Sequence, residues 1–186
     1  MVVELKHGPS RITINEDQGY TYGSADNIQS YVFEYLLNCS NRVDIISNCA
    51  IQVTDEFEEV VSCILLANGY WTHIHEHSVI VHDNSCIVAV GCCVASVSLP
   101  HLQLEWSKIV DDSKCEEIHT VANGKNLITR GSNRIACLTY RGKLIWEIKG
   151  GYEFFNGFCL HEKHLEIIDW DHNTCCLDLA TGCKIK

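Results

Sequence analysis

Residues 126–151, NLITRGSNRIACLTYRGKLIWEIKGG, read as two short apolar strands, a turn marked by glycine, and a tryptophan near the end of the second strand. This segment recurs along the chain, and recurrence at a fixed period is the signature of a repeat architecture. Forty residues upstream, without a gap, it is repeated by IVAVGCCVASVSLPHLQLEWSKI. The residue pairs that match at this offset are Ile87 with Leu127, Val88 with Ile128, Gly91 with Gly131, Leu104 with Leu144, and Trp106 with Trp146.

The pattern returns downstream in LEIIDWDHNTCCLDLATGCKIK, residues 165–186. At an offset of 39 to 40 residues, the matching pairs are Ile167 with Ile128, Cys176 with Cys137, Leu177 with Leu138, and Gly182 with Gly142. A fourth unit is expected from about 41 to 83, because DIISNCAIQV and VVSCILLANGYW are strand-like. The chain therefore contains three clear copies of one unit and a fourth of weaker similarity.

Each unit alternates strands of four to seven residues, rich in Ile, Val, Leu, Cys and Thr, with turns marked by glycine. The turns are Asn68-Gly69, Asn123-Gly124, Arg141-Gly142 and Thr181-Gly182. Four antiparallel strands in about 40 residues is the size of one β-propeller blade. The segments RIACLTYRGKLIWEI and NTCCLDLATGCKI resemble the blade of WD-type and quinoprotein-like β-propellers, and this resemblance covers about residues 85–186.

We therefore predict a single domain, residues 1–186, that is all-β with one short helix and forms a small or partial β-propeller. About four blades of about 40 residues fill the chain, at the low end of the range of typically 4–8 blades. The expected units are 41–83, 84–123, 124–164 and 165–186. Since the last unit has only two strands, the N-terminal strands at 2–15 are expected to complete it and to close the ring.

The one predicted helix lies at about residues 26–37. Its apolar residues fall at i, i+3, i+4, i+7 and i+8, which places them on one face of about three turns. They are Ile28, Tyr31, Val32, Tyr35 and Leu36, with Ser24 or Asp26 as the N-cap. We expect this helix to cover an open end of the ring, and the alternative is a helix that binds a partner.

The 12 cysteines are predicted to be reduced and buried. The sequence shows no export signal, no CxxC pair and no apolar run long enough to span a membrane. Instead, Cys93, Cys115, Cys137 and Cys159 follow one another at intervals of 22 residues, which indicates a rhythm of hairpins rather than of metal ligands. We expect a cytoplasmic protein without membrane contact.

The net charge of −10 favours cationic partners and disfavours direct binding to nucleic acid phosphates or anionic lipid. Eight of the 24 acidic residues gather in two connecting segments, which makes these segments the candidate binding surface. They are Asp55, Glu56, Glu58 and Glu59 in DEFEE, and Asp111, Asp112, Glu116 and Glu117 in DDSKCEE. If both segments share one rim of a toroidal fold they form an anionic patch; otherwise they are two solvated loops on different sides.

Aromatic residues near the acidic segments would supply the apolar anchors that tight protein binding needs. The candidates are Phe57 and, in the YEFF run, Tyr152, Phe154 and Phe155.

The segment WTHIHEHSVIVHD contains His73, His75 and His77 in alternation. In a strand these side chains would point to one face, about 6–7 Å apart, and imidazoles so placed could bind zinc, copper or iron. The segment is weakly similar to the H-x-H of cupins, but the acid and the glycine-rich second motif of that family are missing. We favour a polar, exposed strand face, with no metal and no cofactor.

Catalytic motifs are missing from the sequence. It contains no nucleophile elbow, phosphate-binding loop, dinucleotide-binding fingerprint or H-E-x-x-H. Asp169, Asp171 and His172 could line the channel of a hydrolytic propeller. We nevertheless predict that the chain is not an enzyme.

In size, acidic charge and lack of catalytic motifs, the chain resembles the immunity proteins of contact-dependent inhibition and related polymorphic toxin systems. The resemblance implies a protein that binds and neutralises a basic, nuclease-type toxin domain, with carboxylates pairing with the Lys, Arg or His residues of the nuclease. One alternative is a metal-dependent enzyme or carbohydrate-binding propeller that uses the His73/His75/His77 row or the central channel. Another is a subunit that completes its ring with a second propeller half.

Overall fold

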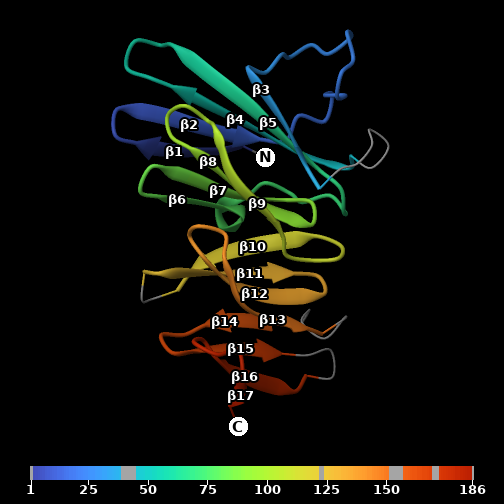
Figure 1. The fold of residues 1–186 in the computed structure, drawn as a ribbon, viewed down its shortest axis with the longest axis vertical. Helices are drawn as coiled ribbons and strands as arrows, with labels where there is room; N and C mark the ends of the chain where they lie inside the picture. Colours follow the sequence, from blue (N-terminus) through green and yellow to red (C-terminus); the bar gives the residue numbers. More distant parts are fainter. Residues whose placement is uncertain (1, 39–44, 122–123, 151–156, 169–171, 186) are drawn as a thin grey trace.

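The computed structural model describes residues 2–38, 45–121, 124–150, 157–168 and 172–185. In this part of the chain the secondary structure is nearly all β, in four sheets that follow one another in chain order along the longest dimension of the molecule (Figure 1). Among the described residues, helical structure is limited to the 3₁₀ turn Glu76–Ser78. The all-β prediction is therefore confirmed.

The first sheet has five strands in the order β1-β2-β4-β5-β3. Neighbouring strands are antiparallel, except that β3 runs parallel to β5. The strands are β1 (Val2–His7), β2 (Ser10–Asn15), β3 (Phe33–Leu37), β4 (Ser47–Thr54) and β5 (Val60–Ala67).

The other three sheets are antiparallel meanders of four consecutive strands, which is the arrangement of a propeller blade. The second sheet comprises β6 (Val79–His82), β7 (Ser85–Val90), β8 (Cys93–Ser98) and β9 (Leu104–Ile109). The third comprises β10 (Cys115–Thr120), β11 (Asn126–Gly131), β12 (Arg134–Thr139) and β13 (Leu144–Lys149). The fourth comprises β14 (Gly157–Leu160), β15 (His164–Ile168), β16 (Thr174–Asp178) and β17 (Lys184–Ile185).

An apolar layer fills each space between successive sheets, because alternate residues of each strand point to opposite faces. Ile51 and Val88 lie in the layer between the first and second sheets. Ile87 and Leu127 lie in the next layer, and Ile128 packs with residues of the fourth sheet. Each fully buried side chain of this size contributes about 1.5–3 kcal/mol, so these layers hold the stack together.

The forty-residue repeat corresponds to a repeated contact between neighbouring sheets. Trp106 at the end of the second sheet donates a hydrogen bond from Nε1 to the carbonyl of Tyr140 (3.1 Å), and Trp146 of the third sheet donates in the same way to Leu179 (2.9 Å). A Cβ on Gly142 would lie 2.5 Å from Trp106, and a Cβ on Gly182 would lie 2.7 Å from Trp146. Both turn positions must therefore be glycine, and the predicted matches of Trp106 with Trp146 and of Gly142 with Gly182 are confirmed.

Part of the predicted alignment is wrong by one residue. Val88 packs toward the first sheet, whereas its predicted match Ile128 packs toward the fourth. The structural equivalent of Ile128 is Ile87, since each of these side chains faces the next sheet along the chain. An alignment error of one residue moves a side chain to the other face of a strand.

The N-terminal strands do not complete the last blade, contrary to the prediction. β1 pairs with β2, and β2 pairs with β4, so both strands belong to the first sheet. The fourth sheet instead has four strands of its own, beginning at Gly157. Figure 1 places the first and fourth sheets at opposite ends of the molecule, so the described residues form an open stack of blades.

The predicted unit boundaries at 84, 124 and 165 fall inside the sheets. The second, third and fourth sheets begin earlier, at Val79, Cys115 and Gly157. The repeat length was predicted correctly, whereas the starting point of each unit was not. The first strand of each of these sheets therefore lies in the preceding predicted unit.

The helix predicted at 26–37 is absent, and residues 33–37 form strand β3 instead. Ile28 is fully exposed, with a relative exposure of 103%, so the predicted apolar stripe is not the buried surface. Tyr31 packs with Tyr20 against the outer face of the first sheet. The segment is thus an irregular strap followed by strand β3, with Tyr31 packed on the outer face of the first sheet.

The described cysteines are all free thiols, and most are buried as predicted. Cys93, Cys115, Cys137 and Cys159 lie on β8, β10, β12 and β14, so their spacing follows every second strand; Cys159 is exposed. None of the described helical segments has the length and apolar character needed to cross a bilayer.

Candidate functional site

The first acidic segment is the tight turn between β4 and β5. Oδ1 of Asp55 accepts hydrogen bonds from the backbone N–H groups of Phe57 (2.8 Å) and Glu59 (2.9 Å). Asp55 therefore shapes the turn, and Glu56, Phe57 and Glu58 form its tip. Glu58 adopts a φ of 63°, a left-handed conformation that glycine or asparagine adopts more readily.

The tip of this turn is open to solvent. Glu56, Glu58 and Glu59 are exposed, and Phe57 keeps 77% of its surface accessible. Among the described residues, none of these carboxylates forms an ion pair with a Lys, Arg or His side chain. The turn therefore presents uncompensated negative charge around an apolar ring.

The second acidic segment begins with a carboxylate that is not available to a partner. Asp111 is fully buried, and its oxygens accept hydrogen bonds from the backbone N–H groups of Ser113 (2.7 Å), Lys114 (3.2 Å), Asn133 (2.8 Å) and Arg134 (2.8 Å). It ties the β9–β10 connection to the β11–β12 turn. The predicted contact of Asp111 with a partner is corrected accordingly, because buried polar groups of this kind hold a fold together.

The remaining carboxylates of this segment are neutralised within the chain. Arg130 donates to Glu117 through Nε (3.0 Å) and Nη2 (2.6 Å) and lies 3.2 Å from Glu116. A hydrogen bond with His119, together with those from Arg130, holds the pKa of Glu117 at about 2, although burial opposes this shift. Asp112 is exposed but is paired with Arg134.

The two acidic segments do not share a rim. The Asp55–Glu59 turn precedes β5, and Asn68 follows the other end of β5, about 25 Å away for eight residues of strand. The carbonyl of Asn68 accepts a hydrogen bond from the N–H of Cys92, and the carbonyl of Cys92 accepts one from the N–H of Asp111. The segments therefore lie at opposite ends of the strands (Figure 1), and a single patch made of both is excluded.

Of the predicted aromatic anchors, Phe57 lies in the acidic turn and is exposed. Tyr152, Phe154 and Phe155 lie outside the described residues, as do Asp169 and Asp171 of the predicted channel.

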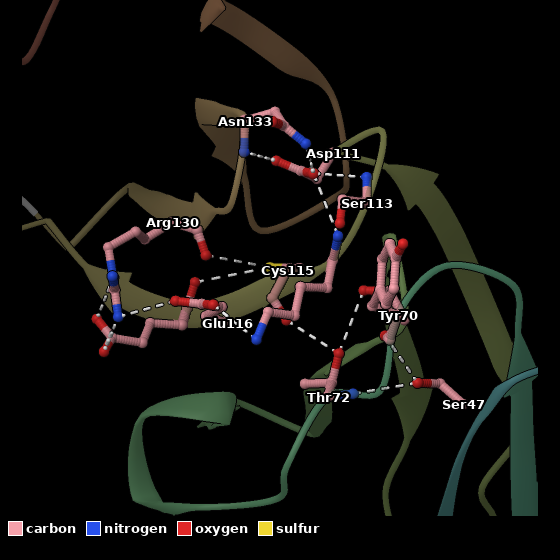
Figure 2. Close-up of polar contacts among 12 residues, drawn as sticks. Ser47, Tyr70, Thr72, Asp111, Ser113, Cys115, Glu116, Arg130 and Asn133 are labelled. Carbon is pink, nitrogen blue, oxygen red and sulfur yellow. Dashed lines mark hydrogen bonds and ion pairs between the residues drawn. The ribbon is translucent and has the colours of Figure 1, made fainter. Parts of the chain in front are cut away.

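Asp111 lies in the β9–β10 connection, and a polar network links the sheets at that end of the strands (Figure 2). Thr72 Oγ1 donates to the carbonyl of Cys115 (3.1 Å), and the N–H of Thr72 donates to Ser47 Oγ (3.1 Å). The N–H of Tyr70 donates to the carbonyl of Ser113 (2.9 Å). The connection between β5 and β6 thus joins the first sheet to the third. Asp111 and its neighbours lie in the segment to which this connection is bonded.

The predicted histidine row does not lie on a strand. Residues 71–75 are irregular, and His77 lies in the 3₁₀ turn. Both ring nitrogens of His75 are engaged: Nε2 lies 3.1 Å from the carbonyl of Glu116, and Nδ1 accepts a hydrogen bond from the N–H of His77. His73 lies 3.5 Å from Glu16. His73 and His75 therefore contact different groups, and the row does not form the single strand face that was predicted.

Sequence reasoning missed the residues that surround this row. His77 stacks on His119 at 5.3 Å, and His119 stacks on Phe158 at 5.0 Å, so a line of rings crosses from the β5–β6 connection to β14. A pocket of about 230 Å³ lies beside it. It is lined by Trp71, Thr72, His73, His75, Lys114, Glu116 and Arg130. His119, Arg130 and Phe158 come from separate strands, so no short motif marks them.

Comparisons with known proteins concern the fold. No protein-family model matches the chain, and no curated protein matches it. Among solved structures, it is similar to the WD40 β-propeller domain of Doa1, with 13% identity and a TM-score of 0.47 over 74% of this chain and 46% of that one. The Neurospora crassa Pan2 WD40 domain shows 15% identity and a TM-score of 0.47, over 59% of this chain and 36% of that one. BamB from Moraxella catarrhalis shows 16% identity and a TM-score of 0.43, over 58% and 34%.

The chain therefore spans between 34% and 46% of the length of these three structures. The assignment of blades rests on the four sheets and on the repeated tryptophan–glycine contacts of this chain.

Proposed function

We propose that this chain is a protein-binding module whose Asp55–Glu59 turn contacts a positively charged partner. The observation that supports this most directly is the set of three carboxylates around Phe57 at the tip of the turn, which are exposed and unpaired within the described part of the chain. Carboxylates of this kind steer a basic partner toward the surface, and an aromatic side chain that becomes buried on contact supplies affinity.

The backbone of the turn supports the same proposal. A left-handed conformation at a residue other than glycine costs about 1 kcal/mol or more, and such positions cluster at functional sites. Glu58 has this conformation although glycine would relieve the cost. A carboxylate therefore stands at the tip of the turn at a conformational cost, which supports a role for its charge.

The narrower form of the proposal is that the partner is a basic, nuclease-type toxin domain and that the chain is its immunity protein. In this case Glu56, Glu58 and Glu59 occupy positions that substrate phosphates would take, and they pair with cationic side chains of the nuclease. The net charge of −10 favours fast association with such a domain. Asp112 and the Asp111 end of the molecule take no part in this contact.

The test is a binding screen against a panel of secreted, basic nuclease toxin domains with inactivated catalytic residues, measured by biolayer interferometry at two salt concentrations. We expect one member to bind tightly and to bind less tightly at higher salt. The Glu56→Gln/Glu58→Gln/Glu59→Gln variant should weaken this complex by about 1,000-fold or more, since charge pairs at interfaces are each worth about 1.5 kcal/mol or more and about 1.4 kcal/mol is a factor of ten.

The matched control removes three exposed carboxylates elsewhere, as Glu4→Gln/Asp26→Asn/Glu162→Gln. This variant has the same net charge and should bind the toxin domain within about threefold of the unmodified chain, since rim charges far from a contact act weakly through a screening solvent. Equal weakening in both variants would show that total charge matters and the turn does not. Failure of all panel members to bind would reject the nuclease partner.

A further inference from the structure

The hairpin of β14 and β15 brings two imidazoles and a carboxylate to one place. The N–H of His161 donates a hydrogen bond to the carbonyl of His164 (2.9 Å), which closes a two-residue turn of Glu162 and Lys163. His161 and His164 therefore lie opposite each other at the end of the hairpin. Glu166 follows His164 by two residues on β15, so both side chains point to the same face of the sheet.

The face that holds these side chains is the outer face of the last sheet. Leu165 and Ile167, which alternate with them, are buried against residues of the third sheet. His164 and Glu166 must therefore point away from the core, and their positions are set by strand register rather than by a loose loop. Strand-borne ligands are held more precisely than ligands on loops.

The three ligand atoms are already close together. The imidazole Nε2 of His161 lies 3.9 Å from a carboxylate oxygen of Glu166, and the two imidazole rings stack with centroids 4.3 Å apart. One ligand atom from each of the three residues lies within 4.8 Å of the others. Ligand atoms around a tetrahedral zinc ion lie about 3.3 Å apart, given metal–ligand bonds of about 2.0–2.1 Å. Side-chain rotations that move the three ligand atoms by about 1 Å would therefore bring them to the spacing that zinc needs.

The donor set indicates the class of ion. Two imidazole nitrogens and one carboxylate oxygen suit zinc and neighbouring first-row transition metals, whereas magnesium and calcium prefer oxygen ligands alone. Three protein ligands leave a fourth position for water. We propose that His161, His164 and Glu166 bind one divalent transition-metal ion, with Zn²⁺ as the best chemical match, and that the ion joins β14 to β15 at the outer face of the last sheet.

The test is a titration of the chelator-treated, reduced full chain with Zn²⁺, followed by isothermal titration calorimetry and by the shift in Tm. We expect saturable one-to-one binding and a higher Tm, because an ion that binds the folded state alone stabilises it. His161→Asn, His164→Asn and Glu166→Gln should each weaken binding by about 100-fold or more, since even loss of an outer partner of a metal ligand costs about 10- to 100-fold. Mg²⁺ should produce no effect.

Three controls make the result specific. Glu162→Gln removes a carboxylate from the same hairpin, and His73→Asn removes an exposed imidazole from a distant segment, and both should retain the affinity of the unmodified chain. Cys159→Ser/Cys176→Ser removes the two thiols that flank Glu166 across the strands and should also retain one-to-one binding. Zinc binding that is absent, that survives loss of His161, His164 and Glu166, or that depends only on the cysteines would overturn the proposal.

Discussion

The turn at Asp55–Glu59 and the segment from Asp111 to Glu117 each carry four carboxylates, and the structure uses them in opposite ways. In the turn, one carboxylate shapes the backbone, and three face solvent without a cationic partner among the described residues. In the second segment, one carboxylate is fully buried, two share Arg130, and one pairs with Arg134.

The difference lies in the hydrogen-bond donors that surround each carboxylate. Asp111 is surrounded by backbone N–H groups from two connections, and Glu117 lies opposite Arg130 in the β10–β11 pair. No comparable donors surround the tip of the β4–β5 turn within the described residues. Charge that is satisfied inside the fold stabilises it, whereas charge that is left unpaired is available to a partner.

The largest effect is expected from removing the buried carboxylate. Asp111→Ala leaves four backbone N–H groups without their acceptor, so the free energy of unfolding should fall by about 3–5 kcal/mol. Urea denaturation followed by circular dichroism measures this change. Asp112→Ala removes the exposed neighbour and should cost less than about 1 kcal/mol; equal losses in the two variants would contradict the distinction between them.

An intermediate effect is expected on the pH dependence of the unfolding free energy in acid. The pKa of Glu117 is lowered to about 2 in the folded state, below the value of about 4.3 in an unfolded chain. The ionised carboxylate therefore stabilises the folded state fully above about pH 4.5, and this contribution is lost as the pH falls toward 2. Unfolding of the Glu117→Gln variant should be less dependent on pH across this window.

The control for this titration is Glu56→Gln, which removes a carboxylate from the free turn. Its unfolding free energy should follow that of the unmodified chain at every pH between 2 and 5. If Glu56→Gln flattened the profile as much as Glu117→Gln, the assignment of the acid sensitivity to the second segment would be wrong.

The smallest effect is expected at the strained residue of the free turn. Glu58→Gly relieves the left-handed conformation and should leave the unfolding free energy unchanged or higher by about 0.5–1 kcal/mol, since the flexibility of glycine in the unfolded chain offsets part of the gain. Differential scanning calorimetry can detect the shift in Tm. A loss of more than 1 kcal/mol would show that the Glu58 side chain supports the fold after all.

The repeat could be predicted from the sequence because it has a physical cause that is visible in residue types. Trp106 with Gly142 and Trp146 with Gly182 form the same contact one blade apart, and only glycine leaves room for the indole. The N-terminal half had no such marker, so its sheet was the least well predicted. The assignment of β1 and β2 to the last blade failed because pairing with β4 leaves no signature in either strand.

The prediction of a helix at 26–37 was wrong for a different reason. The apolar spacing there fits a helix, but β5 offers an unpaired edge to which Phe33–Leu37 can bond as a parallel strand. Aromatic residues such as Phe33 and Tyr35 favour a strand at such an edge. Tertiary pairing therefore overrode a local pattern that was itself correctly read.

The sequence identifies the two acidic segments, but it does not show which of their carboxylates are paired within the fold. The two acidic segments look alike until the register of β10 and β11 places Arg130 beside Glu117. The residues His161, His164 and Glu166 were missed because the predicted boundary at 164/165 separated them into two units. In the structure they belong to one hairpin, and only the hairpin brings them together.

The most direct test of the central claim compares two variants that each lose two carboxylates, by urea denaturation at neutral pH. Glu116→Gln/Glu117→Gln leaves Arg130 without its partners and should lower the unfolding free energy by about 2–4 kcal/mol. Glu56→Gln/Glu58→Gln should stay within about 0.5 kcal/mol of the unmodified chain, as is usual for exposed positions. Equal losses in the two variants, or a larger loss from the turn, would contradict the account.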